Sequence, residues 1–135
     1  MDPLARLTEE LTRPPFNAWL GLRAVTVEPD RVQVALPFRP ELAGGTDPYL
    51  FHGGILASLA DVAGYAVSAI ATGGRTPTIG LHIEYLRPAS PVDLIATATV
   101  RRLGRSLLRV DVEIHADNSL VAIARGNFTN TGGAQ

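Results

Sequence analysis

A single acidic residue stands within the most apolar stretch of the sequence. From Ile55 to Ala71 nearly every residue is Ala, Leu, Val, Ile, Gly or Ser, and Asp61 is the only charged one. Burying an ionised carboxylate is costly unless it is paired, and perturbed carboxylates often mark functional sites. Asp61 is therefore a candidate general base or nucleophile. The alternative is structural, with Asp61 facing a polar seam and accepting a hydrogen bond from Ser58 on the same helix surface.

Two adjacent glycines, Gly53 and Gly54, stand where this apolar helix is expected to begin. The first four N–H groups of a helix have no partner within the helix, and the helix dipole favours negative charge there. Because glycine has no side chain, a ligand carbonyl or phosphate can approach these donors closely. The pair therefore predicts an oxyanion hole, although a plain turn into a helix uses the same residues.

The segment HGGILASLAD, which places Asp61 nine residues after His52, is similar to the signature of one enzyme family. It resembles the hotdog-fold acyl-CoA thioesterases of the phenylacetic-acid-degradation (PaaI-like) type. The similarity includes Tyr85-Leu86-Arg87-Pro88-Ala89 and the Gly104-Arg105-Ser106 turn, so it spans roughly residues 20–128. The resemblance implies hydrolysis of a coenzyme A thioester to a free acid and CoA. It implies no metal and no cofactor, since coenzyme A is part of the substrate.

The resemblance also implies roles for three of these residues. Asp61 matches the nucleophile or general base toward water, and the family chemistry leaves both roles open. Gly53 matches the residue whose backbone N–H polarises the thioester carbonyl. Thr78 matches a Ser or Thr that helps to hold the attacking water, although an ordinary strand threonine looks the same in a sequence.

Three further residues belong to the same expected site. His52 either contacts the substrate or has a structural role, capping the helix and orienting the loop before it. Gly54 is grouped with the substrate-binding residues because it shares the helix start. At Thr46 the sequence departs from the pattern, since relatives usually carry an Asn there that helps to fix the acid or the substrate.

Coenzyme A is held in relatives largely at the surface, near the turn after the fourth strand and around the Arg-Pro pair. Arg87, Arg102 and Arg105 are the candidates here, and we expect one or two of them to contact phosphate. Taken singly, each is also a typical solvated surface charge.

We expect a homodimer, and a dimer of dimers in keeping with relatives, because the edge strands of a small sheet need a partner or protection. The resemblance implies that each active site combines Asp61 of one chain with the Gly53 N–H of the other. Within one chain the two groups are eight residues apart, about 12 Å along a helix axis, which is too far for both to touch one carbonyl.

The elements that must position these residues follow from the hydrophobic periodicity. One domain is expected over residues 1–135, with a helical cap over residues 1–15 and a frayed tail over residues 130–135. The pattern predicts an α+β fold, and the resemblance names it a hotdog fold, with an antiparallel sheet of five to six strands wrapped around one long central helix. Residues 37–51 are expected to form a loop. The predicted helices and strands are Pro3–Thr12, a strand from Leu20, Arg31–Leu36, the long helix ended by Gly73-Gly74, Thr78–Tyr85, Leu94–Arg101, Leu108–His115 and Leu120–Thr129.

Composition excludes several other classes of function. A net charge of -1 gives no field that would attract nucleic acid or an anionic membrane, so we expect neither partner. Cysteine is absent, and the scattered His52, His82 and His115 lack the spacing of metal ligands. The first residues carry an early acid and no apolar core like that of a secretory signal, so we expect a cytoplasmic protein.

Two alternatives to a thioesterase remain at this point. A non-catalytic acyl-CoA-binding or regulatory module is compatible with the departure at Thr46. A hotdog hydratase or dehydratase would pair an acid with a histidine in a loop motif that this sequence lacks. The acyl group stays open among aromatic, aliphatic and hydroxylated acids, because it depends on how side chains such as Leu50, Tyr65 and Ile79 are arranged.

Overall fold

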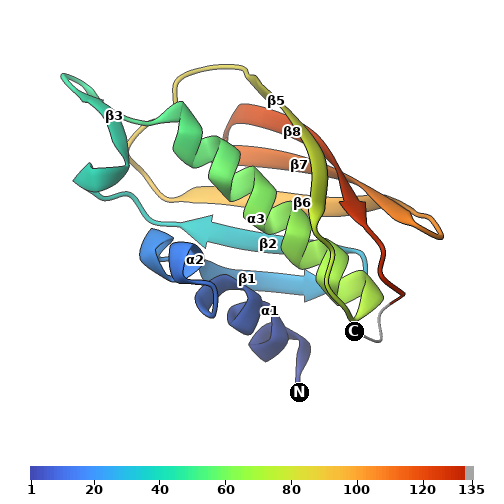
Figure 1. The fold of residues 1–135 in the computed structure, drawn as a ribbon. Coiled ribbons are helices and arrows are strands. Elements are labelled where there is room, and N and C mark those ends of the chain that lie inside the picture. The colour runs from blue at the N-terminus through green and yellow to red at the C-terminus, as the bar shows by residue number, and fades with distance from the viewer. Residues whose placement is uncertain (133–135) are drawn as a thin grey trace.

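The computed structural model describes residues 1–132, and Figure 1 shows one long helix lying across one face of a sheet. The tail expected over residues 130–135 therefore lies outside the described residues from position 133 onward. The elements are α1 (Pro3–Thr12), α2 (Pro15–Leu20), β1 (Arg23–Glu28), β2 (Arg31–Leu36), the short 3₁₀ helix η1 (Pro40–Leu42), β3 (Ala43–Thr46), β4 (Tyr49–Phe51), α3 (Gly53–Thr72), β5 (Thr78–Tyr85), β6 (Leu94–Leu103), β7 (Leu107–Ala116) and β8 (Ser119–Thr129).

Six of the strands form one antiparallel sheet in the order β1-β2-β6-β7-β8-β5, so β1 and β5 are its edges. Side chains alternate across it because successive residues of a strand point to opposite faces. In β7 the buried residues are Leu108, Val110, Val112 and Ile114, while Arg109, Asp111, Glu113 and His115 point to the other face. The buried face packs on α3, which confirms the predicted α+β hotdog fold.

The central helix α3 begins after His52 and ends at Gly73, whose left-handed φ of 78° suits glycine. It has the length and apolar composition of a membrane span, but half of it is buried inside the protein. At Gly64 the helix approaches the sheet so closely that an added Cβ would lie 2.5 Å from the Phe128 ring. The sheet covers the helix incompletely. Ile55, Ser58, Asp61 and Tyr65 are only half-buried.

The N-terminal segment contains the predicted helix and a second one that the sequence pattern did not reveal. In α1, Leu7 and Leu11 are fully buried, whereas Leu4 is exposed. The strand expected from Leu20 was wrong at its start, because Leu20 ends α2 and β1 begins only at Arg23. Contacts distant in sequence hold α2 in place: the Arg39 guanidinium lies 4.5 Å from the Trp19 ring centroid and donates hydrogen bonds to the carbonyls of Trp19 and Leu20.

Residues 37–51, expected to be a loop, contain η1 and a small hairpin of β3 and β4. The hairpin pairs Thr46 with Tyr49 and Ala43 with Phe51 around a register shift at the two glycines. A strand containing Gly44 and Gly45 gives no hydrophobic alternation, which is why the sequence pattern did not indicate it. The hairpin leads directly into α3 and so sets the direction in which the chain enters the first turn of this helix.

Candidate active site

The carboxylate of Asp61 is anchored by the first residue of the edge strand β5. The Thr78 hydroxyl donates a hydrogen bond of 2.7 Å to Asp61 Oδ1. Asp61 Oδ2 has no hydrogen-bond partner among the described residues. The alternative in which Ser58 donates to Asp61 is wrong, because the Ser58 hydroxyl donates to the Gly54 carbonyl at 2.9 Å. The acid is thus held in one orientation with one oxygen available.

The first turn of α3 is fixed by two side chains that act on the same peptide group. His52 Nδ1 accepts a hydrogen bond of 2.8 Å from the Gly54 N–H, as a helix N-cap does. The Tyr85 hydroxyl donates a hydrogen bond of 2.7 Å to the Gly53 carbonyl. The peptide that joins Gly53 to Gly54 is therefore held at its N–H and at its C=O.

This arrangement leaves the N–H groups of the two glycines in different states. The Gly54 N–H is already engaged by His52. The Gly53 N–H has no acceptor among residues 1–132, and it belongs to the exposed start of the helix, where the dipole favours negative charge. His52 itself is exposed and acts here as the cap, which is the structural one of its two expected roles.

Tyr85 is the site residue that sequence reasoning missed. In the sequence it stands only as the first residue of the Tyr85-Leu86-Arg87-Pro88-Ala89 segment, and no role was assigned to it. Its ring lies 3.4 Å from where a Cβ of Gly53 would be, so it covers the helix start as well as bonding to it. Its place in that segment was the only signal, because Tyr85 stays 52% exposed and its hydrogen bond reaches a residue distant in the chain.

The two halves of the expected chemistry lie apart within one chain. Gly53 and Asp61 are separated by about 12 Å along the axis of α3. The contacts with β5 show the same separation. Thr78, which bonds to Asp61, begins this strand, and Tyr85, which bonds to Gly53, ends it. The two ends of β5 are about 23 Å apart at the usual rise of a strand.

The three arginines expected to hold coenzyme A divide between these two ends of the sheet. Arg102 and Arg105 lie at or after the end of β6, at the end of the sheet where Thr78 pairs with Phe128. Arg87 follows Tyr85 at the opposite end. All three are exposed, and none forms an ion pair among the described residues. One chain therefore does not gather them into one patch.

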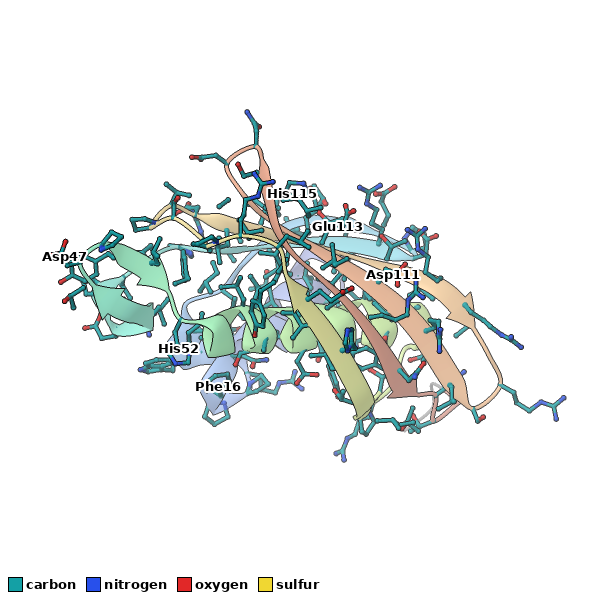
Figure 2. All side chains as sticks on the ribbon, turned by 90° about the horizontal axis from the view of Figure 1, so that it is seen from above. Phe16, Asp47, His52, Asp111, Glu113 and His115 are labelled. Atoms are coloured by element: carbon teal, nitrogen blue, oxygen red, sulfur yellow. The ribbon has the colours of Figure 1, made fainter. Side chains whose placement is uncertain are left out.

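The β3–β4 hairpin carries Thr46 and projects away from the helix. Thr46 is exposed and its side chain forms no hydrogen bond within the described part of the chain. Figure 2 shows Asp47 at the tip of this hairpin and His52 at its base, where α3 begins. Asp47 is thus an exposed turn residue rather than a second acid beside Asp61.

A cavity of about 540 Å³ opens beside Asp61 on the side of α1. Two ion pairs line part of its wall: Arg6–Glu10 within α1, at 3.2 Å, and Glu9 of α1 with the C-cap residue Arg13, at 2.9 Å. The lining residues are Arg6, Glu9, Glu10, Arg13, Pro14, Asn17, Asp61, Val62, Tyr65, Gly73, Gly74 and Arg75. Asp61 therefore has direct access to a space large enough for a small ligand.

The opposite face of the sheet holds a second groove, of about 710 Å³. Figure 2 shows Asp111, Glu113 and His115 along β7, and these residues belong to the face that points away from α3. The hydrogen bond from Arg125 lowers the pKa of the Asp111 carboxyl; partial burial opposes this shift, and a hydrogen bond from Arg101 adds to it.

Over residues 1–132, no three His, Cys, Asp or Glu side chains are grouped to hold a metal ion.

Comparison with known proteins gives one consistent match. Residues 50–123 match a family model described as the thioesterase superfamily. The medium/long-chain acyl-CoA thioesterase YigI of Escherichia coli K12 is 30% identical over 121 residues, which cover 78% of this chain and 78% of that protein. A putative esterase of Halobacterium salinarum is 30% identical over 123 residues, covering 82% of this chain and 81% of its own length.

Solved structures agree with these sequence matches. A crystal structure of a protein from the thioesterase superfamily superimposes with a TM-score of 0.90 at 32% identity, covering 94% of this chain and 97% of that one. The PaaI protein of the Escherichia coli phenylacetic acid degradation operon superimposes with a TM-score of 0.78 at 27% identity, covering 93% and 94% of the two chains.

Proposed function

The chain belongs to the thioesterase superfamily, and from this premise we propose that it is an acyl-CoA thioesterase, which cleaves a coenzyme A thioester into a free acid and CoA. The observation that carries the proposal is the anchored acid. Asp61 stands alone in an apolar helix, is oriented by Thr78 and keeps Oδ2 available beside a cavity. A carboxylate with no chemical task would gain nothing from this placement, since partial desolvation costs free energy.

In the proposed reaction, the thioester carbonyl lies between Asp61 Oδ2 and a backbone N–H donor. Water attacks the carbonyl carbon while Asp61 takes its proton, or Asp61 attacks first and water then cleaves the anhydride. In both routes the C–S bond breaks, the CoA sulfur leaves and is protonated, and the acyl group leaves as the free acid. Both routes need negative charge on the carbonyl oxygen to be stabilised by a fixed donor, and one preorganised oxyanion-hole donor typically contributes about 10²- to 10³-fold to kcat.

The donor that we propose is the Gly53 N–H of a partner subunit. Within one chain this group is about 12 Å from Asp61 along the helix, so one thioester carbonyl does not reach both. A two-fold axis that places two α3 helices side by side brings the Gly53 of each chain toward the Asp61 of the other. The homodimer is therefore part of the proposed mechanism, and the exposed edge strands β1 and β5 leave backbone groups available for pairing between chains.

Two sets of similarities point to different acyl groups of the substrate. The signature over residues 52–61 and the PaaI neighbour support a PaaI-like enzyme. The YigI relatives instead support medium or long acyl chains. A non-catalytic acyl-CoA-binding module is the second candidate, and the observation in its favour is Thr46, which is exposed and departs from the Asn that the resemblance implies at this position.

Release of free CoA thiol from a panel of acyl-CoAs tests the proposal. The panel should contain short, long, aromatic and dicarboxylic acyl groups, with the Asp61→Asn protein as the matched control. We expect catalytic turnover by the natural protein and almost none by the variant. Binding of acyl-CoA without thiol release, for every member of the panel, would instead identify a binding module.

A further inference from the structure

The cavity beside Asp61 is placed to hold the acyl part of the substrate. Asp61, Val62 and Tyr65 all line it, and Tyr65 is one turn beyond Asp61, about 6 Å along the axis. A group in this cavity is thus within one turn of the reacting carbonyl. The phosphates of coenzyme A are separated from the thioester sulfur by the whole pantetheine arm, so they belong elsewhere on the surface.

The lining of this cavity is unusual for a hydrocarbon site. Small-molecule pockets are lined mainly by apolar and aromatic side chains, whereas six of the twelve lining residues here are charged. An alkyl chain placed here would remove polar groups from water without giving them a partner, which costs free energy.

Ion pairing leaves one cation of the cavity available. Arg6 pairs with Glu10, and Arg13 pairs with Glu9. Arg75 has no acidic partner in the described part of the chain, and no ion pair joins it to Asp61. Arg75 is therefore the one cation of the cavity lining without an ion-pair partner in the described part of the chain.

Tyr65 adds a second polar group to the cavity lining. Its side chain is half-buried, lines the cavity and has no hydrogen-bond partner for its hydroxyl over residues 1–132. The segment that carries Arg75 is tied to the same turn of the helix, because the Thr76 hydroxyl donates a hydrogen bond of 3.1 Å to the Tyr65 carbonyl. A guanidinium and a phenol held on linked segments are suited to a carboxylate, which accepts hydrogen bonds from both.

We propose that this cavity binds the terminal carboxylate of a dicarboxylic acyl group, so that the preferred substrates are monothioesters of dicarboxylic acids with coenzyme A. The proposal rests on the thioesterase function proposed above and specifies its substrate class. Arg75 supplies the charge, Tyr65 supplies a hydrogen bond, and the cavity of about 540 Å³ has room for the acyl chain. This preference differs from the medium and long chains named for the YigI relatives.

A length-matched pair of substrates tests the proposal. Adipyl-CoA and hexanoyl-CoA both have six acyl carbons and differ in the terminal carboxylate, so the ratio of their kcat/KM values isolates its recognition. We expect the natural protein to favour adipyl-CoA by about 10- to 100-fold, the range of a charged hydrogen bond. Arg75→Gln should remove most of that ratio, and Tyr65→Phe should reduce it by about 3- to 10-fold, as expected for a neutral hydrogen bond.

Two further variants make the comparison specific. Arg75→Lys keeps the charge but not the forked donor geometry and should retain part of the ratio. Arg31→Gln removes an exposed, unpaired arginine outside the cavity lining and should leave the ratio unchanged. Melting temperatures of all variants within a few degrees of the natural protein would show that the differences arise in recognition.

Three outcomes would overturn the proposal. A preference for hexanoyl-CoA would show that the cavity takes hydrocarbon. Equal losses for both substrates in Arg75→Gln would show that Arg75 contacts a coenzyme A phosphate. If no thioester is hydrolysed, the proposed enzyme activity fails, and the cavity is then tested by calorimetric binding of both acyl-CoAs to the Asp61→Asn protein, where equal Kd values would reject carboxylate recognition.

Discussion

The first turn of α3 and the turn that carries Asp61 hold their functional groups in different ways. At the first turn the functional group is a backbone N–H, and side chains from two other positions, His52 and Tyr85, fix the neighbouring peptide. At Asp61 the functional group is a side chain, fixed at one oxygen by Thr78 and open to a cavity at the other. The first is a rigid donor, and the second is an acid with room beside it.

The difference shows why neither region is sufficient. The first turn can stabilise negative charge but offers no base, whereas the Asp61 turn offers a base and space but no free N–H donor. Because one helix keeps them about 12 Å apart, the proposed mechanism combines the Gly53 N–H of one copy of the chain with Asp61 of another at one carbonyl. Breaking each region separately should therefore give different kinetic signatures.

The largest effect is expected for Asp61→Asn. We expect kcat to fall by about 10² to 10⁴, the range for losing a positioned acid or base. The melting temperature should stay equal or rise, because the neutral amide relieves the desolvation of a charge that serves chemistry. Thiol-release kinetics and thermal unfolding of the same preparation check both parts. A lowered melting temperature with nearly unchanged kcat would instead make Asp61 a structural hydrogen-bond acceptor.

A smaller effect is expected for Tyr85→Phe, which keeps the ring over Gly53 and removes only the hydrogen bond to its carbonyl. The first peptides of α3 should then be less well fixed, and kcat should fall by about 5- to 20-fold with little change in KM, the scale of one hydrogen bond. Tyr49→Phe is the matched control, since Tyr49 is exposed and its hydroxyl has no partner among residues 1–132. If Tyr85→Phe and Tyr49→Phe had equal kcat and KM values, the Tyr85 hydroxyl would have no role in catalysis.

The smallest effect is expected on the far face of the sheet, with Asp111→Asn. Activity should not change, and the melting temperature at neutral pH should fall by about 1–3 °C, since exposed ion pairs contribute little. The pKa of Asp111 is lower in the folded protein than in the unfolded chain, so its stabilising effect is present above the unfolded pKa and is lost as pH falls through the folded pKa. The difference in melting temperature should therefore disappear in acid. A loss of thioesterase activity would show that the far face contributes to the site.

The parts of the fold that were predicted correctly are those with a clear period. The long helix over Gly53–Thr72 and the four strands after it have continuous apolar or alternating patterns, and the structure confirms them. The missed parts are short and depend on distant contacts. The helix α2 is held by Arg39 against Trp19, and the β3–β4 hairpin contains two glycines, so neither shows in a local pattern.

The same division applies to the site. Asp61 and Gly53 could be proposed as site residues because their neighbours in sequence already mark them as unusual, and the resemblance added their expected roles. The bond between Tyr85 and Gly53 joins residues 32 positions apart, and the cavity joins α1 to the segment around Arg75. Such juxtapositions follow from the packing of the sheet on the helix, which the sequence pattern alone did not specify.

The most direct test of the shared site is complementation between two inactive variants, Asp61→Asn and Gly53→Pro. Proline deletes the Gly53 N–H at a first-turn position, where it is well tolerated. The backbone accepts it, since Gly53 has no positive φ and His52 has the extended φ of -65° and ψ of 134° that a residue before proline prefers. Each variant alone should be nearly inactive.

When the two variants are co-expressed in equal amounts and pair at random, half of the dimers are mixed. Each mixed dimer has one site with both changes and one site with neither, so about a quarter of the natural activity should return. Subunits carrying different affinity tags allow the mixed dimers to be isolated and measured. Activity in isolated mixed dimers no greater than that of the single variants would place Asp61 and its donor within one chain and contradict the account.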